Sequence, residues 1–302
     1  MQLGLGTAQF GSAYGVTNPS GQVPEEMVAL ILRAAERLGV RLLDTAAAYG
    51  LAEESLGRTL WSGHPFRIVT KTQPISSKTI SPRDIDTVHS AFLRSLDRIK
   101  TAKVAGLLVH HSGELLLPGG AALADLLRDL KSQGKVEKIG FSCYTPEDLE
   151  QASTVLVPDL VQVPASVLDR RFIDSGVLSR MKAGGTEVHA RSIFLQGLLL
   201  TRAIDHPPRF LKHREVFQEL ERRAAGCDST PAQFALEFIR TRKEIDAAVV
   251  GVCSARQLEE ICVAALNSGR TTCCFDGLAS GDLSLLIPSR WNPDATTNGT
   301  PS

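Results

Sequence analysis

The stretch LLDTAAAYG, residues 42–50, joins two leucines of core type to an aspartate, three consecutive alanines, a tyrosine and a glycine. A strand that ends in a helix cap explains these residues on their own, because aspartate accepts hydrogen bonds from the free N–H groups at a helix start. The same residues can also form half of an active site. The choice between the two depends on which polar residues end the other strands of the chain.

Short, β-rich apolar runs recur between amphipathic stretches, an alternation typical of parallel βαβ units. Eight such runs are predicted strands, at 3–7, 41–44, 67–71, 105–110, 137–142, 160–163, 187–191 and 247–251. The spacing of apolar residues predicts helices over 24–38, 82–99, 121–130, 146–154, 174–183, 213–225, 231–241 and 255–267. No internal repeat or low-complexity linker marks a second domain.

Eight strand and helix units predict an α/β protein, a single-domain (β/α)8 TIM barrel that spans residues 1–291. A doubly wound open sheet has the same local pattern and is the alternative fold. Residues 292–302, NPDATTNGTPS, are polar throughout and predict a disordered C-terminal tail.

The charge balance argues against a polyanionic partner. Lys and Arg total 33 and Asp and Glu total 33, so no net field attracts nucleic acid or an anionic membrane surface. No apolar run is long enough for a membrane span, and the first residues lack the pattern of a secretory signal, so we expect a cytoplasmic protein. The six cysteines include no CxxC pair and no Cys/His cluster at zinc spacing, so no metal site is predicted.

In a (β/α)8 barrel the active site forms at the carboxyl ends of the strands. Asp44, Lys71 and His110 end the second, third and fourth predicted strands, and Tyr49 follows Asp44 by five residues. If side chains alternate between faces, Val69 and Lys71 point into the barrel together. Neighbouring strands lie about 4.8 Å apart, so these groups are expected to share one patch.

Such a patch is suited to proton transfer. A free tyrosine has a pKa of about 10 and needs a nearby cation to act near neutrality. Lys71 supplies that charge, Asp44 orients Lys71, and Tyr49 gives a proton to a carbonyl oxygen that His110 polarises as hydride arrives. Taken singly, each residue has a structural explanation, as a cap, a strand-end lysine, a loop aromatic or a core-edge histidine. Their order on consecutive strand ends favours the catalytic interpretation.

Several ordered segments resemble the aldo-keto reductases over nearly the whole chain. They are LGLGT at 3–7, DTAAAYG at 44–50, VTK at 69–71, LLVH at 107–110, GFS at 140–142, VQVP at 161–164, RSIFLQGLLL at 191–200 and VGVCSARQLEE at 250–260. The RSIFLQGLL segment is similar to a bacterial branch of that family, many members of which are associated with sugar and polysaccharide pathways.

The resemblance implies a (β/α)8 barrel that binds a nicotinamide dinucleotide without a Rossmann domain, and the chain has no GxGxxG at a strand-to-helix turn. By position, Asp44, Tyr49, Lys71 and His110 match the catalytic tetrad of the family, with Tyr49 as general acid/base. The positions that match cofactor-binding residues are Ser142, Gln162, Arg191, Ser192, Leu195, Gln196, Gly197, Gly251, Arg256, Gln257 and Glu260.

Some positions depart from the family pattern. Cys143 stands where Asn is usual beside the nicotinamide carboxamide, and Arg191 replaces an aromatic residue that stacks on the nicotinamide. Gln257 and Ile261 stand where Arg and Asn are frequent around the 2′-phosphate. The resemblance therefore implies NADP(H) as the default cofactor, with NAD(H) as the alternative.

The loop after the first strand, GTAQFGSAYG at 6–15, carries Gln9, Phe10 and Tyr14. These residues either form a wall of the substrate pocket or cover the rim of the barrel. Glu53 and Glu54, just after Tyr49, are expected to begin a helix, because acidic residues suit its positive end.

Together these features predict an NAD(P)H-dependent oxidoreductase that reduces a small aldehyde, ketone or sugar-derived carbonyl, or oxidises the corresponding alcohol. One alternative is a regulatory or low-turnover protein that keeps the same barrel and cofactor. Another is an unrelated barrel hydrolase or isomerase that uses Asp44 and His110. The expected partner is a small-molecule carbonyl compound, and the sequence leaves the oligomeric state open.

Overall fold

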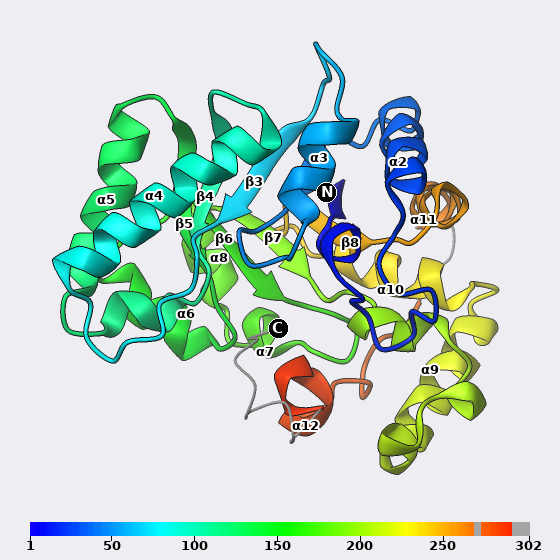
Figure 1. The fold of residues 1–302 in the computed structure, drawn as a ribbon. Helices are drawn as coiled ribbons and strands as arrows, with labels where there is room; N and C mark the ends of the chain where they lie inside the picture. The colour runs from blue at the N-terminus through cyan, green and yellow to red at the C-terminus, as the bar shows by residue number, and fades with distance from the viewer. Residues whose placement is uncertain (269–272, 292–302) are drawn as a thin grey trace.

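The computed structural model describes residues 1–268 and 273–291, and the predicted disordered tail at 292–302 lies outside the described residues. Its strands form a closed parallel barrel in chain order, with β8 paired to β1 (Figure 1). This closure confirms the (β/α)8 barrel and excludes the open sheet. The strands are β1 (Gln2–Gly6), β2 (Leu42–Asp44), β3 (Arg67–Lys71), β4 (Val104–Val109), β5 (Val136–Ser142), β6 (Leu160–Pro164), β7 (Glu187–Arg191) and β8 (Ala247–Gly251).

Helices surround the strands on the outside of the barrel (Figure 1). The α-helices are α1 (Ala8–Gly11), α2 (Glu25–Arg37), α3 (Ala52–Thr59), α4 (Pro82–Ile99), α5 (Gly120–Ser132), α6 (Pro146–Ser153), α7 (Arg171–Asp174), α8 (Val177–Ala183), α9 (Arg214–Gly226), α10 (Pro231–Arg240), α11 (Ala255–Asn267) and α12 (Leu283–Leu286). Short 3-10 helices are η1 (Ser112–Leu116), η2 (Leu195–Leu200), η3 (Ala203–Asp205), η4 (Pro208–His213) and η5 (Pro288–Arg290).

Local sequence explains where the main helices begin. The side chain of Ser81 accepts a hydrogen bond from the Asp84 N–H, and the Asp84 carboxylate accepts one in return from the Ser81 N–H. Thr230 and Gln233 make the same reciprocal pair at the start of α10. Each pair satisfies backbone groups that a helix end leaves without partners, so the start of each helix is fixed.

The alternation of side chains along the strands is as predicted. Leu42, Val69, Leu108, Leu160 and Ala247 form a small cluster of their own, separate from the large cluster to which Leu107 and Val109 belong. Side chains at alternate positions of a strand point to opposite faces, so the small cluster fills the barrel interior and the large one packs against the helices. Two residues after Leu42 and Val69, on the same face, come Asp44 and Lys71.

One predicted helix differs in the structure, and one predicted helix start makes contacts that the sequence did not indicate. The helix predicted at 174–183 is two helices, because Gly176 adopts a left-handed conformation with φ of +72° between α7 and α8. Glu53 lies in the first turn of α3, as expected, but it is buried. Its carboxylate accepts hydrogen bonds from Thr70 Oγ1 at 2.7 Å and from Arg98 Nε, which is 3.0 Å away. Glu53 therefore ties α3 to β3 and α4.

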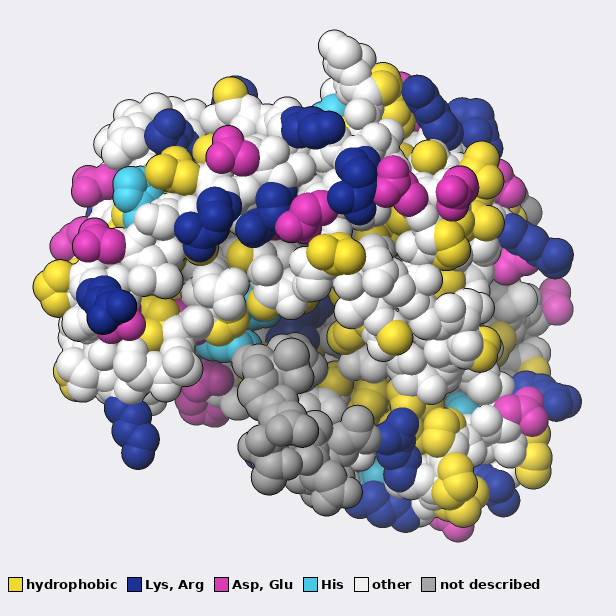
Figure 2. All heavy atoms as spheres, in the orientation of Figure 1, with side chains coloured by type: hydrophobic (Ala, Val, Ile, Leu, Met, Phe, Trp, Pro, Cys, Tyr) yellow, Lys and Arg dark blue, Asp and Glu magenta, His cyan; other side chains and the backbone are white. Residues whose placement is uncertain are grey.

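Charged side chains of both signs are interspersed on the face of the molecule drawn in Figure 2. This distribution agrees with the equal totals of basic and acidic residues. Among the described residues, no helix is long and apolar enough to cross a membrane.

The close approach of α3 to α4 predicts the effect of one substitution. A Cβ added at Gly57 would lie 1.8 Å from the carbonyl oxygen of Arg98, whereas one added at Gly226 would meet nothing within 4 Å. We expect Gly57→Ala to lower the free energy of unfolding by about 1–3 kcal/mol or more, because the helices must separate. Urea unfolding of this variant beside Gly226→Ala measures the difference. Equal stabilities of the two variants would contradict the tight contact.

Candidate active site

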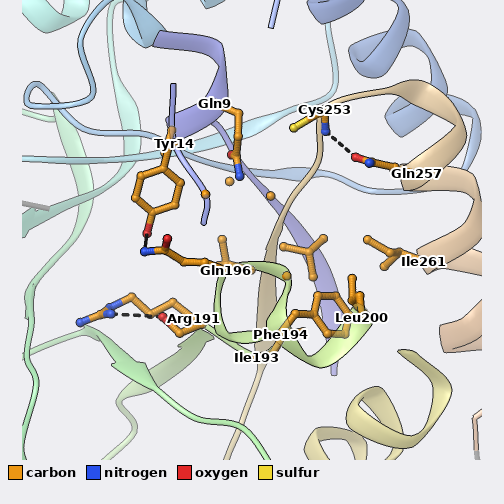
Figure 3. A pocket seen from close by; sticks show the side chains of 18 of the residues that line it. Gln9, Tyr14, Arg191, Ile193, Phe194, Gln196, Leu200, Cys253, Gln257 and Ile261 are labelled. Carbon is orange, nitrogen blue, oxygen red and sulfur yellow. Dashed lines mark hydrogen bonds between the residues drawn. The ribbon is translucent and has the colours of Figure 1, made fainter. Parts of the chain in front are cut away.

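A cavity of about 1020 Å³ opens at the carboxyl ends of the strands. Its wall includes Asp44, Tyr49, Lys71 and His110, from β2, β3 and the segments that follow β2 and β4. The cavity extends to α11. Figure 3 shows lining residues other than these four, among them Gln9, Arg191 and Gln257. The volume lies at the upper end of the range typical of small-molecule and cofactor sites.

A buried ion pair lies at the base of this cavity. Lys71 Nζ donates to Asp44 Oδ1 at 2.8 Å and to Oδ2 at 2.9 Å, and also to the carbonyl oxygen of Thr45 at 3.2 Å. Gln162 Nε2 donates to Asp44 Oδ1 at 2.7 Å. Burial lowers the pKa of Lys71, and the charge of Asp44 opposes that effect. The Lys71 ammonium is thus held in place by Asp44 of β2 and by the Thr45 carbonyl that follows it. The Asp44 carboxylate is also bound by Gln162 of β6.

Tyr49 and His110 lie next to this pair. Their rings meet edge to face, with centroids 5.9 Å apart, and Lys71 Nζ lies 4.9 Å from the centroid of the Tyr49 ring. Burial, and then the charge of Asp44, raise the pKa of Tyr49. Tyr49 is therefore a neutral phenol at neutral pH, able to donate a proton.

His110 is held as a neutral imidazole. Burial, and then the positive charge of Lys71, lower the pKa of His110 to about 2. Its backbone N–H donates to Thr72 Oγ1 at 3.2 Å, whereas its Nδ1 has no hydrogen-bond partner in the part of the chain that the structure describes. A phenol and a neutral imidazole thus border the same space beside an ammonium, an arrangement that can polarise and protonate a carbonyl oxygen.

Gln162 is completely buried, and its Oε1 has no hydrogen-bond partner among the described residues. A buried polar atom without a partner carries a free-energy cost that a bound ligand can relieve. Ser142, at the end of β5, pairs in register with Gln162 and also lines the cavity. These two residues offer a hydroxyl and an amide oxygen to a ligand.

The loop after β7 is held in an unusual conformation. Ser192, Leu195, Gln196 and Gly197 all have positive φ, between +46° and +94°. Positive φ is rare for residues other than glycine and persists where surrounding contacts determine it.

Those contacts come from the loop after β1. Gln196 Nε2 donates to the Tyr14 hydroxyl at 3.1 Å, as Figure 3 shows. Its Oε1 accepts from the Val16 N–H at 3.2 Å, and its carbonyl accepts from Thr17 Oγ1 at 3.0 Å. We refer to these bonds between Tyr14–Thr17 and Gln196 as the clasp. It joins two segments of the cavity wall that are about 180 residues apart in the chain.

The cavity wall ends at the start of α11. Ser254 Oγ accepts from the Gln257 N–H at 3.2 Å, and Gln257 Oε1 accepts from the Cys253 N–H at 2.7 Å (Figure 3). Arg256 Nε pairs with Glu260 Oε1 at 2.8 Å on an exposed part of the helix. Among the residues described, no group of three His, Cys, Asp or Glu side chains is arranged to hold a metal ion.

The structure brings nearly all the predicted site residues together around one cavity. Those that line it are Asp44, Tyr49, Lys71, His110, Ser142, Gln162, Arg191, Ser192, Gln196, Gly197, Gly251, Arg256, Gln257 and Glu260. The side chain of Leu195 instead packs in the core, with 1% of its surface exposed.

The loop after β1 answers the question that its sequence left open. Gln9 and Tyr14 line the cavity, whereas Phe10 is completely buried in the core. Sequence reasoning missed Tyr144 and the segment 230–233, which also line the cavity. The residue spacing of segment 230–233 gave no indication that it lies near the strand ends.

Comparison with known proteins identifies the family. The protein-family model described as "Aldo/keto reductase family" matches residues 2–268. The chain belongs to the aldo/keto reductase family. The L-galactose dehydrogenase of Arabidopsis thaliana is 26% identical to it over 271 residues, covering 85% of this chain and 82% of that protein. The NADH-specific methylglyoxal reductase of Escherichia coli is 23% identical, covering 88% of this chain and 90% of that protein.

Solved structures support the fold of this aldo/keto reductase. One from Bacillus halodurans, in its holo form, superimposes with a TM-score of 0.71 at 16% identity, covering 96% of this chain and 95% of that chain. At this identity the likeness concerns the barrel and not the substrate.

The neutral state of His110 predicts a pH effect on stability. An unfolded chain protonates this histidine below its ordinary pKa of 6.5, whereas the folded protein does so only near pH 2. The unfolded state therefore gains protons as pH falls below about 6.5, and the folded state loses stability by up to about 1.4 kcal/mol per pH unit from this group. Urea unfolding between pH 4 and 8 should show a shallower decline for His110→Asn than for the wild type. Parallel declines would contradict the assignment.

The clasp predicts a second substitution effect. A Cβ at Gly197 would lie 1.9 Å from Thr17 Oγ1, whereas at Gly185, with a similar φ of +87°, it would meet nothing within 4 Å. Gly197→Ala should be less stable than Gly185→Ala by about 1–3 kcal/mol, because only the former adds a clash to the backbone strain. Thermal unfolding of both variants tests this, and indistinguishable midpoints would contradict the clasp geometry.

Proposed function

We propose that the protein is a carbonyl reductase that depends on NADPH or NADH, or an alcohol dehydrogenase in the reverse direction. The observation that carries this proposal is the convergence of Tyr49, Lys71, Asp44 and His110 at one end of a cavity large enough for a dinucleotide and a small substrate. Since one relative is named an L-galactose dehydrogenase and another a methylglyoxal reductase, small sugars and short-chain carbonyls form the first substrate panel.

The residues present fit a nicotinamide cofactor. The partnerless Oε1 of Gln162 can accept an amide N–H, and the Ser142 hydroxyl lies on the neighbouring strand. We assign Ser142 and Gln162 to the nicotinamide carboxamide. The residues assigned to the rest of the dinucleotide are Arg191, Ser192, Leu195, Gln196, Gly197, Gly251, Arg256, Gln257 and Glu260. Leu195, whose side chain is buried in the core, would contribute through its backbone. When bound, this cofactor supplies the hydride.

The side chains of the protein supply the proton. Tyr49 gives the proton of its hydroxyl to the carbonyl oxygen, and the phenolate that remains is stabilised by the nearby Lys71 ammonium. Asp44 keeps Lys71 oriented and neutralises it at rest. His110 remains uncharged, so it positions and polarises the oxygen by a hydrogen bond and does not compete as an acid.

The resemblance to the family implies NADPH as the default cofactor and NADH as the alternative. Arg256 is the one basic residue of the cavity wall at the start of α11, within the described residues, and it is already paired with Glu260. This pair uses Nε of Arg256 on an exposed part of the helix, so the other N–H groups of its guanidinium can still reach a 2′-phosphate. Titration of both reduced cofactors, followed by nucleotide fluorescence, compares the two affinities directly.

A regulatory or low-turnover protein is the second candidate. Cys143, at the position next to Ser142, has no side-chain amide to offer the cofactor, and this departure favours it. Tight cofactor binding without turnover over a broad carbonyl panel would support that candidate.

The proposal predicts that Tyr49→Phe lowers kcat by about 10²-fold or more, the range typical of losing a general acid. The affinity for the reduced cofactor should remain close to that of the wild type, because the substitution removes a proton and not a nucleotide contact. Steady-state kinetics and fluorescence titration of the same preparation measure both quantities. A variant that keeps most of its rate would rule out Tyr49 as the acid.

A further inference from the structure

The charged residues of the cavity wall are unevenly paired. Within the described residues, its Lys and Arg side chains are Lys71, Arg191 and Arg256. Lys71 is bound to Asp44, and Arg256 is bound to Glu260. Arg191 has no carboxylate within 4.0 Å in the described part of the chain.

None of the acidic residues that line the cavity in the described part of the chain forms an ion pair with Arg191. Asp44 and Glu260 hold the other two cations, and Glu259 pairs with Arg37 outside the cavity. Arg191 is therefore a cation in the wall without a counter-charge in the described protein.

The contacts that Arg191 does make are weak. Nη1 donates to Ser192 Oγ and Nη2 to the Cys143 carbonyl, each at 3.4 Å. Its guanidinium carbon also lies 4.2 Å from the centroid of the Tyr144 ring. A guanidinium has five N–H donors, so most of this capacity remains for a ligand.

The electrostatic neighbours of Arg191 include three tyrosine side chains. Tyr14, Tyr49 and Tyr144 lie close enough to interact electrostatically with it. Burial raises the pKa of Tyr14 to about 12, so this phenol carries no negative charge at neutral pH. A partly buried cation without a partner is unfavourable, and guanidinium is suited to carboxylate and phosphate.

Two sources can bring an oxyanion to Arg191, the substrate or the diphosphate of the cofactor. Arg191 lies near Tyr49 and Cys143, and Figure 3 shows its side chain on the opposite side of the view from Gln257 and Ile261. This position, beside the proton donor, favours the substrate.

We propose that Arg191 binds a carboxylate or phosphate carried by the same molecule as the reacting carbonyl. Anionic carbonyl compounds are then the preferred substrate class. This inference rests on the proposed function, and it makes Arg191 a specificity-determining residue in addition to a neighbour of the cofactor.

Matched substrate pairs test the inference. The carboxylate pair is succinic semialdehyde and butanal, and the phosphate pair is glyceraldehyde 3-phosphate and glyceraldehyde. In the wild type, kcat/KM should favour the anionic member of one pair. Arg191→Gln should lower that preference by at least about tenfold, the effect of losing a charge-assisted hydrogen bond, and Arg191→Lys should restore part of it.

The control is Arg202→Gln, which removes an exposed guanidinium outside the cavity, paired with Asp205. It should leave the preference unchanged. The dissociation constant of the reduced cofactor, measured for each variant, separates the two sources. A preference that is unchanged in Arg191→Gln, with or without a loss of cofactor affinity, overturns the inference, as does a wild type that favours neither anionic substrate.

Failure of the proposed function is distinguishable from failure of this inference. If neither these pairs nor the panel of small sugars and short-chain carbonyls is turned over, the proposed function fails. Calorimetry with 4-hydroxybutanoate and glycerol 3-phosphate then decides the role of Arg191. Binding that is lost in Arg191→Gln supports an oxyanion site, and no binding to the wild type overturns it.

Discussion

The ion pair between Lys71 and Asp44 is the interaction on which the site depends. It is nearly inaccessible to solvent, with 1% and 6% of the two side chains exposed. Two charges in such a place are costly to desolvate, and removal of one partner from a buried pair typically costs about 3–5 kcal/mol. Hydrogen bonds from Gln162 to Asp44 and from Lys71 to the Thr45 carbonyl offset part of this desolvation free energy. Three strands are thereby fixed relative to one another.

The same pair sets the electrostatics around it. The charge of Lys71 helps keep His110 neutral, and the charge of Asp44 helps keep Tyr49 protonated. Under the proposed function, a resting site with a neutral phenol, a neutral imidazole and a compensated ammonium can give up one proton and stabilise the anion that results. This balance of charges follows from the geometry of the strand ends.

Much of this could be predicted from the sequence because parallel strands constrain their ends. Once the alternation placed Val69 inside, Lys71 had to face the same way, and the neighbouring ends of β2 and β4 had to bring Asp44 and His110 close. Helix boundaries were less predictable. Gly176 interrupted a predicted helix because its left-handed conformation is a property of the backbone that the apolar spacing does not contain.

Other parts of the site are set by tertiary contacts. Gln196 has a positive φ because it is bound to the loop after β1, and no local pattern signals this. Since Tyr14–Thr17 emerge first from the ribosome and Gln196 only some 180 residues later, a nascent chain cannot shape this wall until most of it has been translated. The pairing of β8 with β1 delays closure further. Prematurely terminated products would thus lack this wall of the cavity.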